Sequence, residues 1–392
     1  MGLSASGVLG AGATGVRKRR RRWLRYGVFG VSGFLLVSAG AGWAVYEKLN
    51  GNITSDTDAA AELKQYEKER PSALVGAAQN ILMIGSDSRA GEGNRRYGRD
   101  LGSERSDTTM LLHLAADRRS ATAVSIPRDL MVHVPDCRRP DGTRTEPVFT
   151  MFNSAFATGG SGCTIRTVEK LTNIRVDHHM VVDFEGFKEM VDAVEGVQVC
   201  LSEPIDDRAA KLRLPAGTQT LDGEQSLGYV RARKSIGNGS DTERMERQQR
   251  FLGALVNKVS SNDVLLNPAM LYPVLDAATS ALTTDPELAS LRGLYDLVRG
   301  VRTIPIERVQ FLTVPRRSYV YNANRDQLVK AEAERLFQRL RSDSPVEVTP
   351  ERPPGSGDNT GKPGDPPRNP SVAPTGPAPT FRGNTAAEDA CG

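Results

Sequence analysis

Arginine and aspartate side chains recur in this sequence where short apolar runs begin or end. The segments are 85–89 (GSDSR), 105–108 (RSDT), 125–129 (SIPRD) and 229–233 (YVRAR), and a helical pattern with further basic residues follows from Asp241. Guanidinium groups gathered at one place repel each other unless an anion lies among them. Arginine suits phosphate because its planar fork binds two oxygens at once and stays charged. The set, whose last two segments add Arg231, Arg233, Arg244, Arg247 and Gln248, therefore predicts a phosphate-binding site.

Carboxylates within the same segments predict a divalent cation beside the phosphate groups. Mg²⁺ commonly takes one or two carboxylates and completes its octahedron with water and phosphate oxygens, and Mn²⁺ is the alternative ion. Together with the arginines, this predicts a bound pyrophosphate. Taken one at a time, such Arg–Asp pairs are more often structural. Arg231 and Arg233 alone fit a solvated edge strand, and Asp241 fits a helix N-cap.

Short apolar runs alternate with helical patterns over residues 79–341, where we expect one folded domain. NILMIGSD, TTMLLHLAAD and ATAVSIPRD are typical of strands, and MVVDFEG, GFKEMVDAV and GVQVCLS of a strand–helix–strand unit. A helix follows from Asp241, then helical pattern over 264–300, a last strand at VQFLTVP and a final helix at about 324–341. In YVRAR we expect a strand that points Arg231 and Arg233 to one face. The predicted fold class is α/β, a mixed α–β sandwich whose central mixed sheet is flanked by helices.

The amino-terminal 78 residues predict a membrane anchor followed by a stalk. Residues 1–26 form a basic arm with seven basic and no acidic side chains, and residues 27–46 carry no charge. Twenty helical residues at about 1.5 Å each span the roughly 30 Å hydrocarbon core. The positive-inside rule keeps the arm cytoplasmic and puts the domain outside. We expect a single-pass signal anchor in the cell membrane, with a cleaved signal peptide as the alternative, and a stalk over 47–78.

Charge and cysteine usage narrow the functional class. Without the seven basic residues of the arm, 44 of the 51 Lys and Arg remain against 47 Asp and Glu, so we expect no specific nucleic-acid binding by the domain. The four cysteines form no C-x-x-C pair, which argues against zinc. Cys137 and Cys163 bracket a loop-like stretch rich in Pro, Gly and Arg, and are the disulfide that we expect in an oxidising compartment. Cys200, which alternates with apolar residues, fits a buried position.

The carboxyl-terminal segment, 342–392, differs in composition from the domain. Eleven of the 23 prolines lie between Pro345 and Pro379, mixed with Gly, Asn, Ser and Asp. Such a segment buries too little apolar surface to offset its ordering entropy. We therefore expect a disordered tail.

Seven blocks of the sequence resemble the LytR–CpsA–Psr family of cell-wall phosphotransferases, in the order of that family. They are GSDSR, RSDTTMLLHL, SIPRDLMVHVP, FNSAFATGG, DFEGFKEMVDAVEGVQV, LPAGTQTLDGEQSLGYVRAR and DTERMERQQRFLGAL, within about residues 79–260. The resemblance implies that Asp87 and Asp107 bind Mg²⁺, that Arg105, Arg128 and Asp107 are catalytic, and that a polyprenyl chain lies in an apolar groove. It also implies that the pyrophosphate is bound by Arg105, Arg128, Arg231, Arg233, Arg244 and Gln248, with Arg89 in the same motif.

The implied reaction transfers a glycopolymer from undecaprenyl pyrophosphate to a peptidoglycan hydroxyl and releases undecaprenyl phosphate, with pyrophosphatase activity when water replaces the acceptor. Wall teichoic acid is one of several polymers that fit. The chain departs from the family pattern in a long loop at 90–104, in Glu195 where glycine is usual at a tight turn, and in the enlarged loop between Cys137 and Cys163, a variant of actinobacterial members. Two alternatives stay open: a membrane-anchored regulator, and a non-catalytic polyprenyl-pyrophosphate-binding protein.

Overall fold

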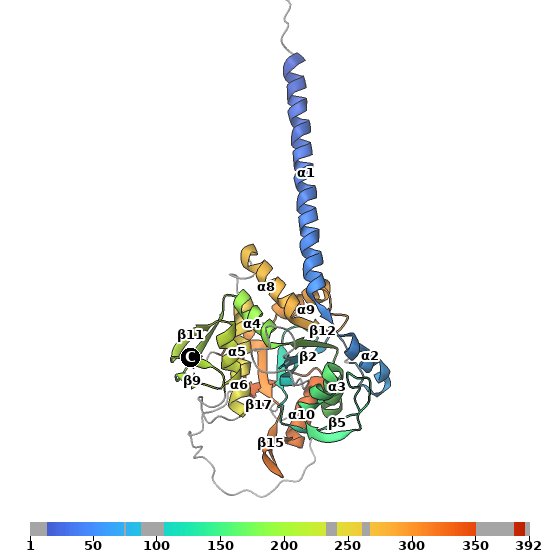
Figure 1. Ribbon diagram of the computed structural model, residues 1–392, viewed down its shortest axis with the longest axis vertical. Helices are drawn as coiled ribbons and strands as arrows, with labels where there is room; N and C mark the ends of the chain where they lie inside the picture. The colour runs from blue at the N-terminus through green and yellow to red at the C-terminus, as the bar shows by residue number, and fades with distance from the viewer. Residues whose placement is uncertain are drawn as a thin grey trace, which may run out of the picture. The chain divides into compact units, whose positions relative to one another are not determined.

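The computed structural model describes residues 14–73, 76–87, 106–232, 241–260, 267–349 and 380–388 (Figure 1). The chain divides into two units, residues 1–51 and residues 52–392. In the first unit α1 (Thr14–Asn52) includes the segment predicted as an anchor. Among the described residues, no helix combines the length and the hydropathy needed to cross a membrane. The anchor over 27–46 stays a prediction, and the side chains of residues 27, 28, 30, 31 and 33 lie outside the description.

The second unit is built on a mixed β-sheet, as predicted. Its described strands are β1 (Thr54–Ser55), β12 (Leu282–Thr284), β7 (His178–Val182), β2 (Gln79–Ser86), β3 (Ser106–Leu114), β4 (Ala121–Ser125), β13 (Val309–Thr313), β17 (Thr380–Thr385) and β16 (Glu347–Thr349), in spatial order. The central strands β2, β3 and β4 are antiparallel neighbours, whereas β7 runs parallel to β2 and β13 parallel to β4.

Helices cover both faces of this sheet (Figure 1). Along β2, Leu82 and Ile84 pack in a core cluster with α3 (Ser154–Thr172) and α10 (Lys330–Arg341), while Ile81 points to the other face, toward α6 (Asp241–Ser260) and α9 (Leu291–Arg302). A third cluster joins α4 (Phe184–Ala193), α5 (Gly223–Arg231) and α6 with two hairpins, β8 (Val197–Leu201) with β11 (Gly217–Leu221) and β9 (Ile205–Asp207) with β10 (Leu212–Leu214). The central strands read as continuous apolar runs because both of their faces are buried.

The predicted strand–helix–strand unit exists in sequence as β7, α4 and β8, but the two strands do not share a sheet. β8 pairs instead with β11 in a separate two-stranded sheet. The helical pattern predicted over 264–300 forms two helices, α8 (Pro268–Ala281) and α9, with β12 between them. The strand at VQFLTVP is β13, and it is not the last. The hairpin of β14 (Arg316–Tyr319) and β15 (Asn322–Leu328) follows it, so the final helix begins only at Lys330.

Residues 52–73 belong to the folded unit, so the stalk predicted over 47–78 is wrong for this stretch. β1 pairs with β12, and α2 (Thr57–Gln65) packs on α3. Glu62 of α2 is buried, and its Oε1 accepts a hydrogen bond from Arg166 Nη1 of α3 at 2.9 Å. The Arg166 guanidinium also lies 3.4 Å from the centre of the Tyr66 ring. Composition misses this packing because polar residues make it.

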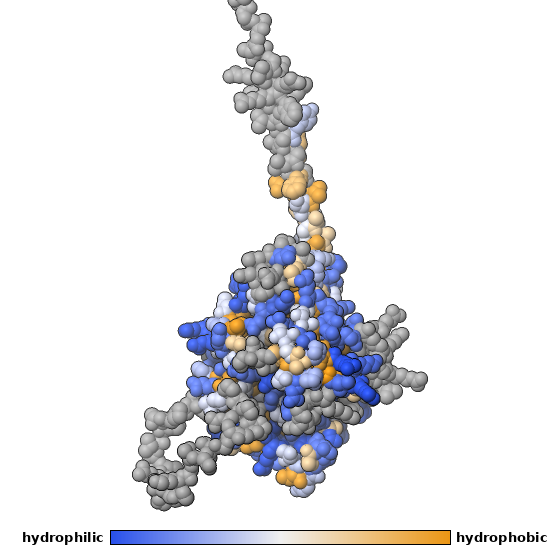
Figure 2. Space-filling model, turned by 90° about the vertical axis from the view of Figure 1, so that its left-hand side faces the viewer, coloured by the Kyte–Doolittle hydropathy of each residue, from blue (hydrophilic) through white to orange (hydrophobic). Residues whose placement is uncertain are grey.

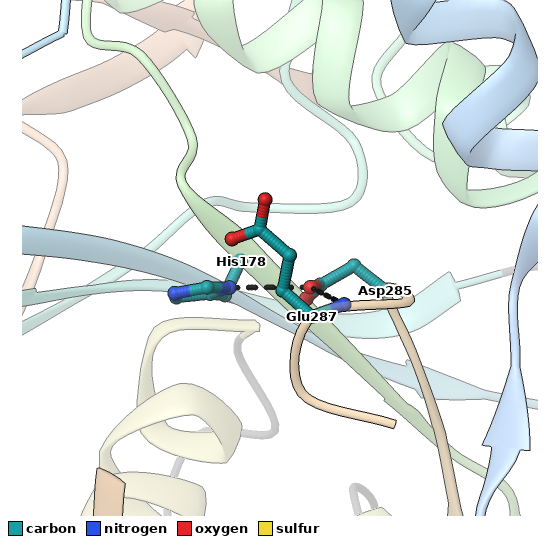
Figure 3. Close-up of side chains that lie close together, drawn as sticks. All are labelled: His178, Asp285 and Glu287. Atoms are coloured by element: carbon teal, nitrogen blue, oxygen red, sulfur yellow. Dashed lines mark hydrogen bonds and ion pairs between the residues drawn. The ribbon is translucent and has the colours of Figure 1, made fainter. Parts of the chain in front are cut away.

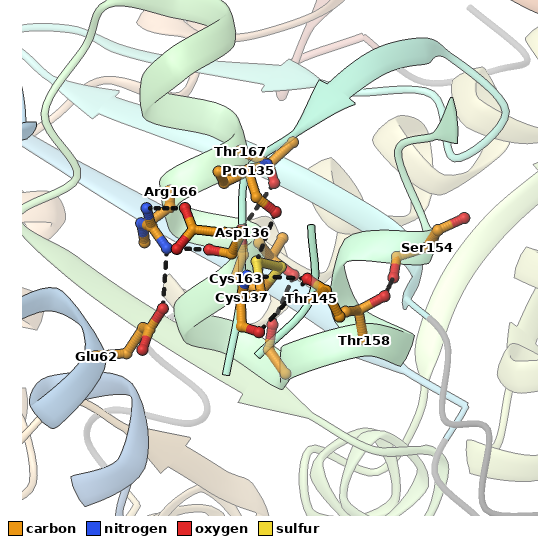
Figure 4. The surroundings of a disulfide bond; sticks show 12 residues. Glu62, Pro135, Asp136, Cys137, Thr145, Ser154, Thr158, Cys163, Arg166 and Thr167 are labelled. Atoms are coloured by element: carbon orange, nitrogen blue, oxygen red, sulfur yellow. Dashed lines mark hydrogen bonds and ion pairs between the residues drawn. A yellow bond between two sulfur atoms is a disulfide. The ribbon is translucent and has the colours of Figure 1, made fainter. Parts of the chain in front are cut away.

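The predicted disulfide between Cys137 and Cys163 is present, with the two Cα atoms 5.5 Å apart, and it joins the loop after β5 (Met131–Val134) to α3 (Figure 4). Gly159 lies against this bond, because a Cβ there would be 2.7 Å from the Arg138 carbonyl oxygen and about 3 Å from both cysteine Cβ atoms. Close packing therefore requires glycine at position 159 of FATGG, whereas Gly160 is favoured by its backbone conformation, with φ +60°. Cys200 is disulfide-bonded as well and is partly exposed, so its expected role as a simply buried residue is wrong.

The segment expected to be a disordered tail contributes two strands to the main sheet. β17 pairs antiparallel with β13, and β16 pairs parallel with β17. Phe381 of β17 is buried in the same cluster as α3 and α10. The prediction is thus wrong for 347–349 and 380–385, and residues 350–379 and 389–392 lie outside the description.

The turn after α4 forms although Glu195 replaces the glycine expected there. The Gly196 amide donates to the Val191 carbonyl at 3.0 Å and the Glu195 amide to the Asp192 carbonyl at 2.9 Å, the two bonds of a Schellman motif. Glu195 has φ +60° and Gly196 has φ +86°. A Cβ on Gly196 would lie 2.8 Å from the Leu221 carbonyl oxygen, so the second position requires glycine.

Candidate functional site

A cavity of about 460 Å³ lies between the sheet and the layer of α4, α5 and α6. Most of its lining is apolar and comes from β2, β3, β7, β12 and these helices: Met83, Met110, Met180, Met190, Phe187, Leu227, Phe251, Leu252, Leu255 and Leu282. Five of the residues predicted to bind phosphate or metal also line it: Asp107, Arg128, Arg231, Arg244 and Gln248. The structure therefore joins an apolar chamber to the predicted cationic site.

Asp107 enters the cavity from a β-bulge at the start of β3. Gly85 pairs with Thr108, and Ser86 pairs with Ser106, so Asp107 has no partner in the ladder. A bulge bends its strand and redirects a side chain, and bulges are frequent next to active sites. The bulge therefore changes the direction that the Asp107 side chain would take in an uninterrupted strand, and this side chain lines the cavity.

Arg128 follows β4 and is held by two carboxylates. Its Nη1 donates to Asp107 Oδ1 at 2.8 Å, and its Nε donates to Asp129 Oδ2 at 3.3 Å. Burial lowers the pKa of Arg128, but Asp107 and Asp129 outweigh burial and hold this pKa above its usual value. The guanidinium is thus fixed in place and charged, as phosphate binding requires.

Arg244 and Gln248 lie one turn apart on α6 and are both buried. Arg244 Nη2 forms an ion pair with Asp241 Oδ1 at 2.6 Å. Gln248 Nε2 donates to the Val230 carbonyl oxygen at 3.1 Å, which ties α6 to the end of α5. This bond leaves the Gln248 side chain at the cavity wall beside the last turn of α5.

Arg231 is the last residue of α5, so the predicted strand at YVRAR is wrong. The helix forms because Asp222 and Gln225 make a capping box, with the Asp222 side chain accepting from the Gln225 amide at 2.8 Å and the Gln225 side chain from the Asp222 amide at 3.1 Å. The Arg231 guanidinium carbon lies 4.6 Å from the centre of the Phe184 ring at the start of α4. Its place at a helix C-terminus favours positive charge.

Three of the predicted phosphate ligands, Arg89, Arg105 and Arg233, lie outside the described residues. Asp87 is described, and it is partly buried directly after β2. Its neighbour Ser86 pairs with Ser106, the neighbour of Asp107. Both aspartates therefore flank one residue pair at the same end of the sheet, although Asp87 is not part of the cavity lining described here.

The model of the LytR_cpsA_psr family matches residues 49–342. The chain belongs to this family. The family match begins at residue 49, within α1, and covers α2 and β1, which agrees with the packing of residues 52–73 on the folded unit.

Individual relatives share this family domain. The chain is 38% identical over 212 residues to "Probable cell wall biosynthesis protein LcpB" of Corynebacterium glutamicum, which is 53% of this chain and 48% of the relative. It is 26% identical over 334 residues to the polyisoprenyl-teichoic acid–peptidoglycan teichoic acid transferase TagT of Bacillus subtilis, 81% of this chain and 95% of the relative. The chain spans about half the length of its corynebacterial relatives.

Solved structures show the same fold. A LytR-Csp2A-Psr enzyme from Actinomyces oris superimposes with a TM-score of 0.54 at 18% sequence identity, over 69% of this chain and 93% of the other. The mixed sheet with helices on both faces is therefore the fold of this LytR_cpsA_psr protein, as its sequence resemblance implied.

Two further carboxylates line the cavity of this LytR_cpsA_psr protein, and sequence reasoning did not include them. Asp183 caps α4 by accepting from the Gly186 amide at 2.8 Å. Asp207 is buried and accepts from the Ala209 and Ala210 amides at 2.9 and 3.1 Å. Both fix local backbone. The methionines of the lining were missed too, because single methionines inside strands and helices carry no pattern.

Among the described residues, one group of His, Asp and Glu side chains has the spacing of a metal site: His178, Asp285 and Glu287 (Figure 3). It lies at the start of β7, whereas Val182 at the other end of that strand lines the cavity. Asp285 Oδ1 accepts from the Glu287 and Leu288 amides at 3.1 and 3.2 Å and lies 3.2 Å from His178 Nδ1. These bonds make Asp285 the cap of a turn.

Proposed function

We propose that this protein is a phosphotransferase that moves a glycopolymer from a polyprenyl-pyrophosphate carrier, such as undecaprenyl pyrophosphate, to a hydroxyl of peptidoglycan. One observation supports this most directly: a single cavity has an apolar lining and a charged group of Asp107, Arg128, Arg231 and Arg244. A lipid pyrophosphate has the same two parts. The name of the TagT relative describes a donor and an acceptor of this kind.

The topology brings the charged residues together at one end of the central strands. Gly85 at the end of β2, Val182 at the end of β7, Asp107 at the start of β3 and Arg128 after β4 all lie at this end and all line the cavity. The polyprenyl chain would therefore occupy the space among the methionines and leucines, and the pyrophosphate would meet the arginines.

The proposed step is a displacement at phosphorus. The oxygen of a sugar hydroxyl attacks the phosphorus that carries the glycan, the bond from this phosphorus to the bridging oxygen breaks, and polyprenyl phosphate leaves. The hydroxyl proton passes to a carboxylate, for which Asp87, Asp107 and Asp129 are the candidates. Such reactions depend on positioning and on stabilising charge more than on a protein nucleophile. Arg128, fixed by two carboxylates, would hold the charge that develops on the leaving phosphate.

Asp87 and Asp107 fit a Mg²⁺ ion, with Mn²⁺ as the alternative. Both flank the Ser86–Ser106 pair, and one or two carboxylates are what Mg²⁺ usually takes from a protein when phosphate supplies further oxygens. Such an ion, when bound, would supply positive charge beside the pyrophosphate. Arg105 would act with Arg128 in catalysis, and Arg89 and Arg233 would complete the phosphate site.

We further propose that the enzyme acts at the outer surface of the cell membrane, with the uncharged segment 27–46 as its anchor and the basic arm in the cytoplasm. A polyprenyl carrier resides in the membrane, so an anchored enzyme would meet it there. The Cys137–Cys163 disulfide supports this location, because disulfides persist in oxidising compartments.

The test uses the full chain in detergent with a synthetic polyprenyl-pyrophosphate-linked disaccharide, with and without Mg²⁺, and measures release of polyprenyl phosphate. We expect Arg128→Ala and Asp107→Asn to lower the rate by a factor of about 10²–10³. Arg128→Lys would recover little, because lysine lacks the planar fork. The matched control is Arg299→Ala, which removes an exposed arginine of α9. Tight donor binding without turnover, unchanged by these substitutions, would instead identify a non-catalytic lipid-pyrophosphate-binding protein.

A further inference from the structure

A row of aromatic side chains lies on the surface formed by two hairpins, and neither the cavity nor the folding core uses it. The first hairpin pairs β5 with β6 (Val148–Met151) and places His133 opposite Phe149. The second pairs β14 with β15 and carries Tyr319 and Tyr321. Successive ring centres are 4.8 Å apart for His133–Phe149, 6.2 Å for Phe149–Tyr319 and 5.4 Å for Tyr319–Tyr321. We call His133, Phe149, Tyr319 and Tyr321 the aromatic row.

The aromatic row is accessible. Tyr321 is 84% exposed, Phe149 is 45% exposed, and the aliphatic neighbours Val148 and Val320 are also exposed. Figure 1 shows the β15 hairpin at the lower end of the folded unit, and Figure 2 shows hydrophobic colour at the same height. Large contiguous apolar groups of this kind are uncommon on a soluble surface and mark contact sites.

The hairpin that carries the aromatic row is tied at its base to the candidate site. The Asp326 amide donates to the Asp129 carbonyl oxygen at 3.1 Å, and Arg325 Nη1 lies 3.6 Å from Asp129 Oδ1. Asp129 in turn holds Arg128. Arg325 of β15 and Tyr321, in the turn before this strand, are four residues apart, which is at most roughly 13 Å in an extended chain. A chain bound along the aromatic row can therefore extend to the edge of the sheet where Arg128 lies.

We propose that the aromatic row binds the glycan strand of the acceptor, peptidoglycan, and presents its hydroxyl to the phosphate site; this rests on the function proposed above. A pyranose ring has a face of C–H groups that stacks on an aromatic ring, whose own face is electron-rich. The rings themselves carry no charge. Arg316 and Arg325 of the same hairpin form ion pairs with Asp326 and Asp129, which reduces the positive charge that a polyanionic donor polymer would select. The exposed side chains of Asn322 and Asn324, one and three residues after Tyr321, suit the N-acetyl groups of wall sugars, and Asn322 Oδ1 also accepts from the Asn324 backbone amide at 3.0 Å.

The test is co-sedimentation of the full chain, in detergent, with insoluble peptidoglycan from which acid has removed the anionic polymers. We expect Tyr321→Ala and Phe149→Ala each to raise the apparent Kd about five- to tenfold and the double variant more, while Tyr321→Trp keeps wild-type binding. The matched control is Tyr295→Ala, because Tyr295 is 63% exposed on α9, away from both hairpins. It should bind as the wild type does.

Each variant is also assayed for release of polyprenyl phosphate from the donor with water as acceptor. We expect Tyr321→Ala to keep this rate, since the aromatic row does not line the cavity. Normal sedimentation of the row variants, or equal loss in Tyr295→Ala, would overturn the proposal while leaving the phosphotransferase in place. A parallel loss of donor turnover would overturn it by assigning the row to the donor. If the wild type binds peptidoglycan through the aromatic row but releases no polyprenyl phosphate, the result supports the proposed role of the row and refutes the proposed transferase activity.

Discussion

Removing the Cys137–Cys163 disulfide should destabilise the folded unit by about 3–4 kcal/mol. The two cysteines are 26 residues apart in sequence. In the chain-entropy model, a closed loop of this length lowers the entropy of the unfolded chain by roughly 12 cal/mol/K, or about 3.5 kcal/mol at 25 °C. Both residues are fully buried, so the double variant Cys137→Ala/Cys163→Ala avoids placing a new hydroxyl in the core.

The assay is urea unfolding followed by circular dichroism. Tryptophan fluorescence does not serve, because Trp23 and Trp43 both lie in α1. Thr143→Ala, an exposed change in the same loop, is the control and should alter stability by less than about 0.5 kcal/mol. A loss below about 1 kcal/mol for the cysteine double variant would refute the reasoning. It would mean that the buried Arg166, which binds Glu62 and the Asp136 loop, already restrains this loop without the covalent link.

Three further perturbations follow from single features. Glu195→Gly should stabilise the protein by about 0.5–1 kcal/mol in the same urea assay, because only glycine adopts positive φ without strain; an unchanged midpoint would contradict this. For His178 burial lowers the pKa, yet Asp285 raises it above the ordinary value near 6.5. The His178–Asp285 ion pair therefore stabilises the folded protein fully below pH 6.5, and this contribution is lost as pH rises through the raised pKa. The Tm of wild type should therefore exceed that of His178→Gln more at pH 6 than at pH 9, and a constant difference would count against the ion pair. Leu255→Trp, which fills the apolar part of the cavity, should slow polyprenyl-phosphate release at least tenfold while Leu255→Met stays near wild type; normal turnover by the tryptophan variant would place the lipid elsewhere.

Sequence patterns predicted the central strands because these strands are buried on both faces and therefore read as apolar runs. The helix from Asp241 was predicted from two other signals, which are acidic residues in its first turn and apolar residues at helical spacing. At YVRAR the alternation of side chains suggested a strand. The capping box of Asp222 and Gln225, seven residues earlier, decides the structure instead, because it satisfies two amides that would otherwise lack partners.

The remaining errors come from pairing that is distant in sequence. β17, with the sequence TFRGNT, has little apolar content, and only its partner β13 makes it a strand. The aromatic row escaped notice for the same reason, since Phe149 and Tyr319 are 170 residues apart and meet only when two hairpins lie together. Five residues of the predicted site do line one cavity, because the residue types that suit an anion are few whatever fold brings them together.

The position of Arg244 gives an electrostatic reason to assign the site to an anion. Arg231 lies at the C-terminus of α5, where the helix dipole favours a cation, so its charge alone needs no ligand. Arg244 lies in the first turn of α6, where the helix dipole places partial positive charge and disfavours a buried guanidinium. One ion pair with Asp241 offsets part of this cost. A bound pyrophosphate would offset more, since the helix N-terminus and the arginine would then attract the same anion. A residue placed against a local rule in this way is the kind of exception found at functional sites.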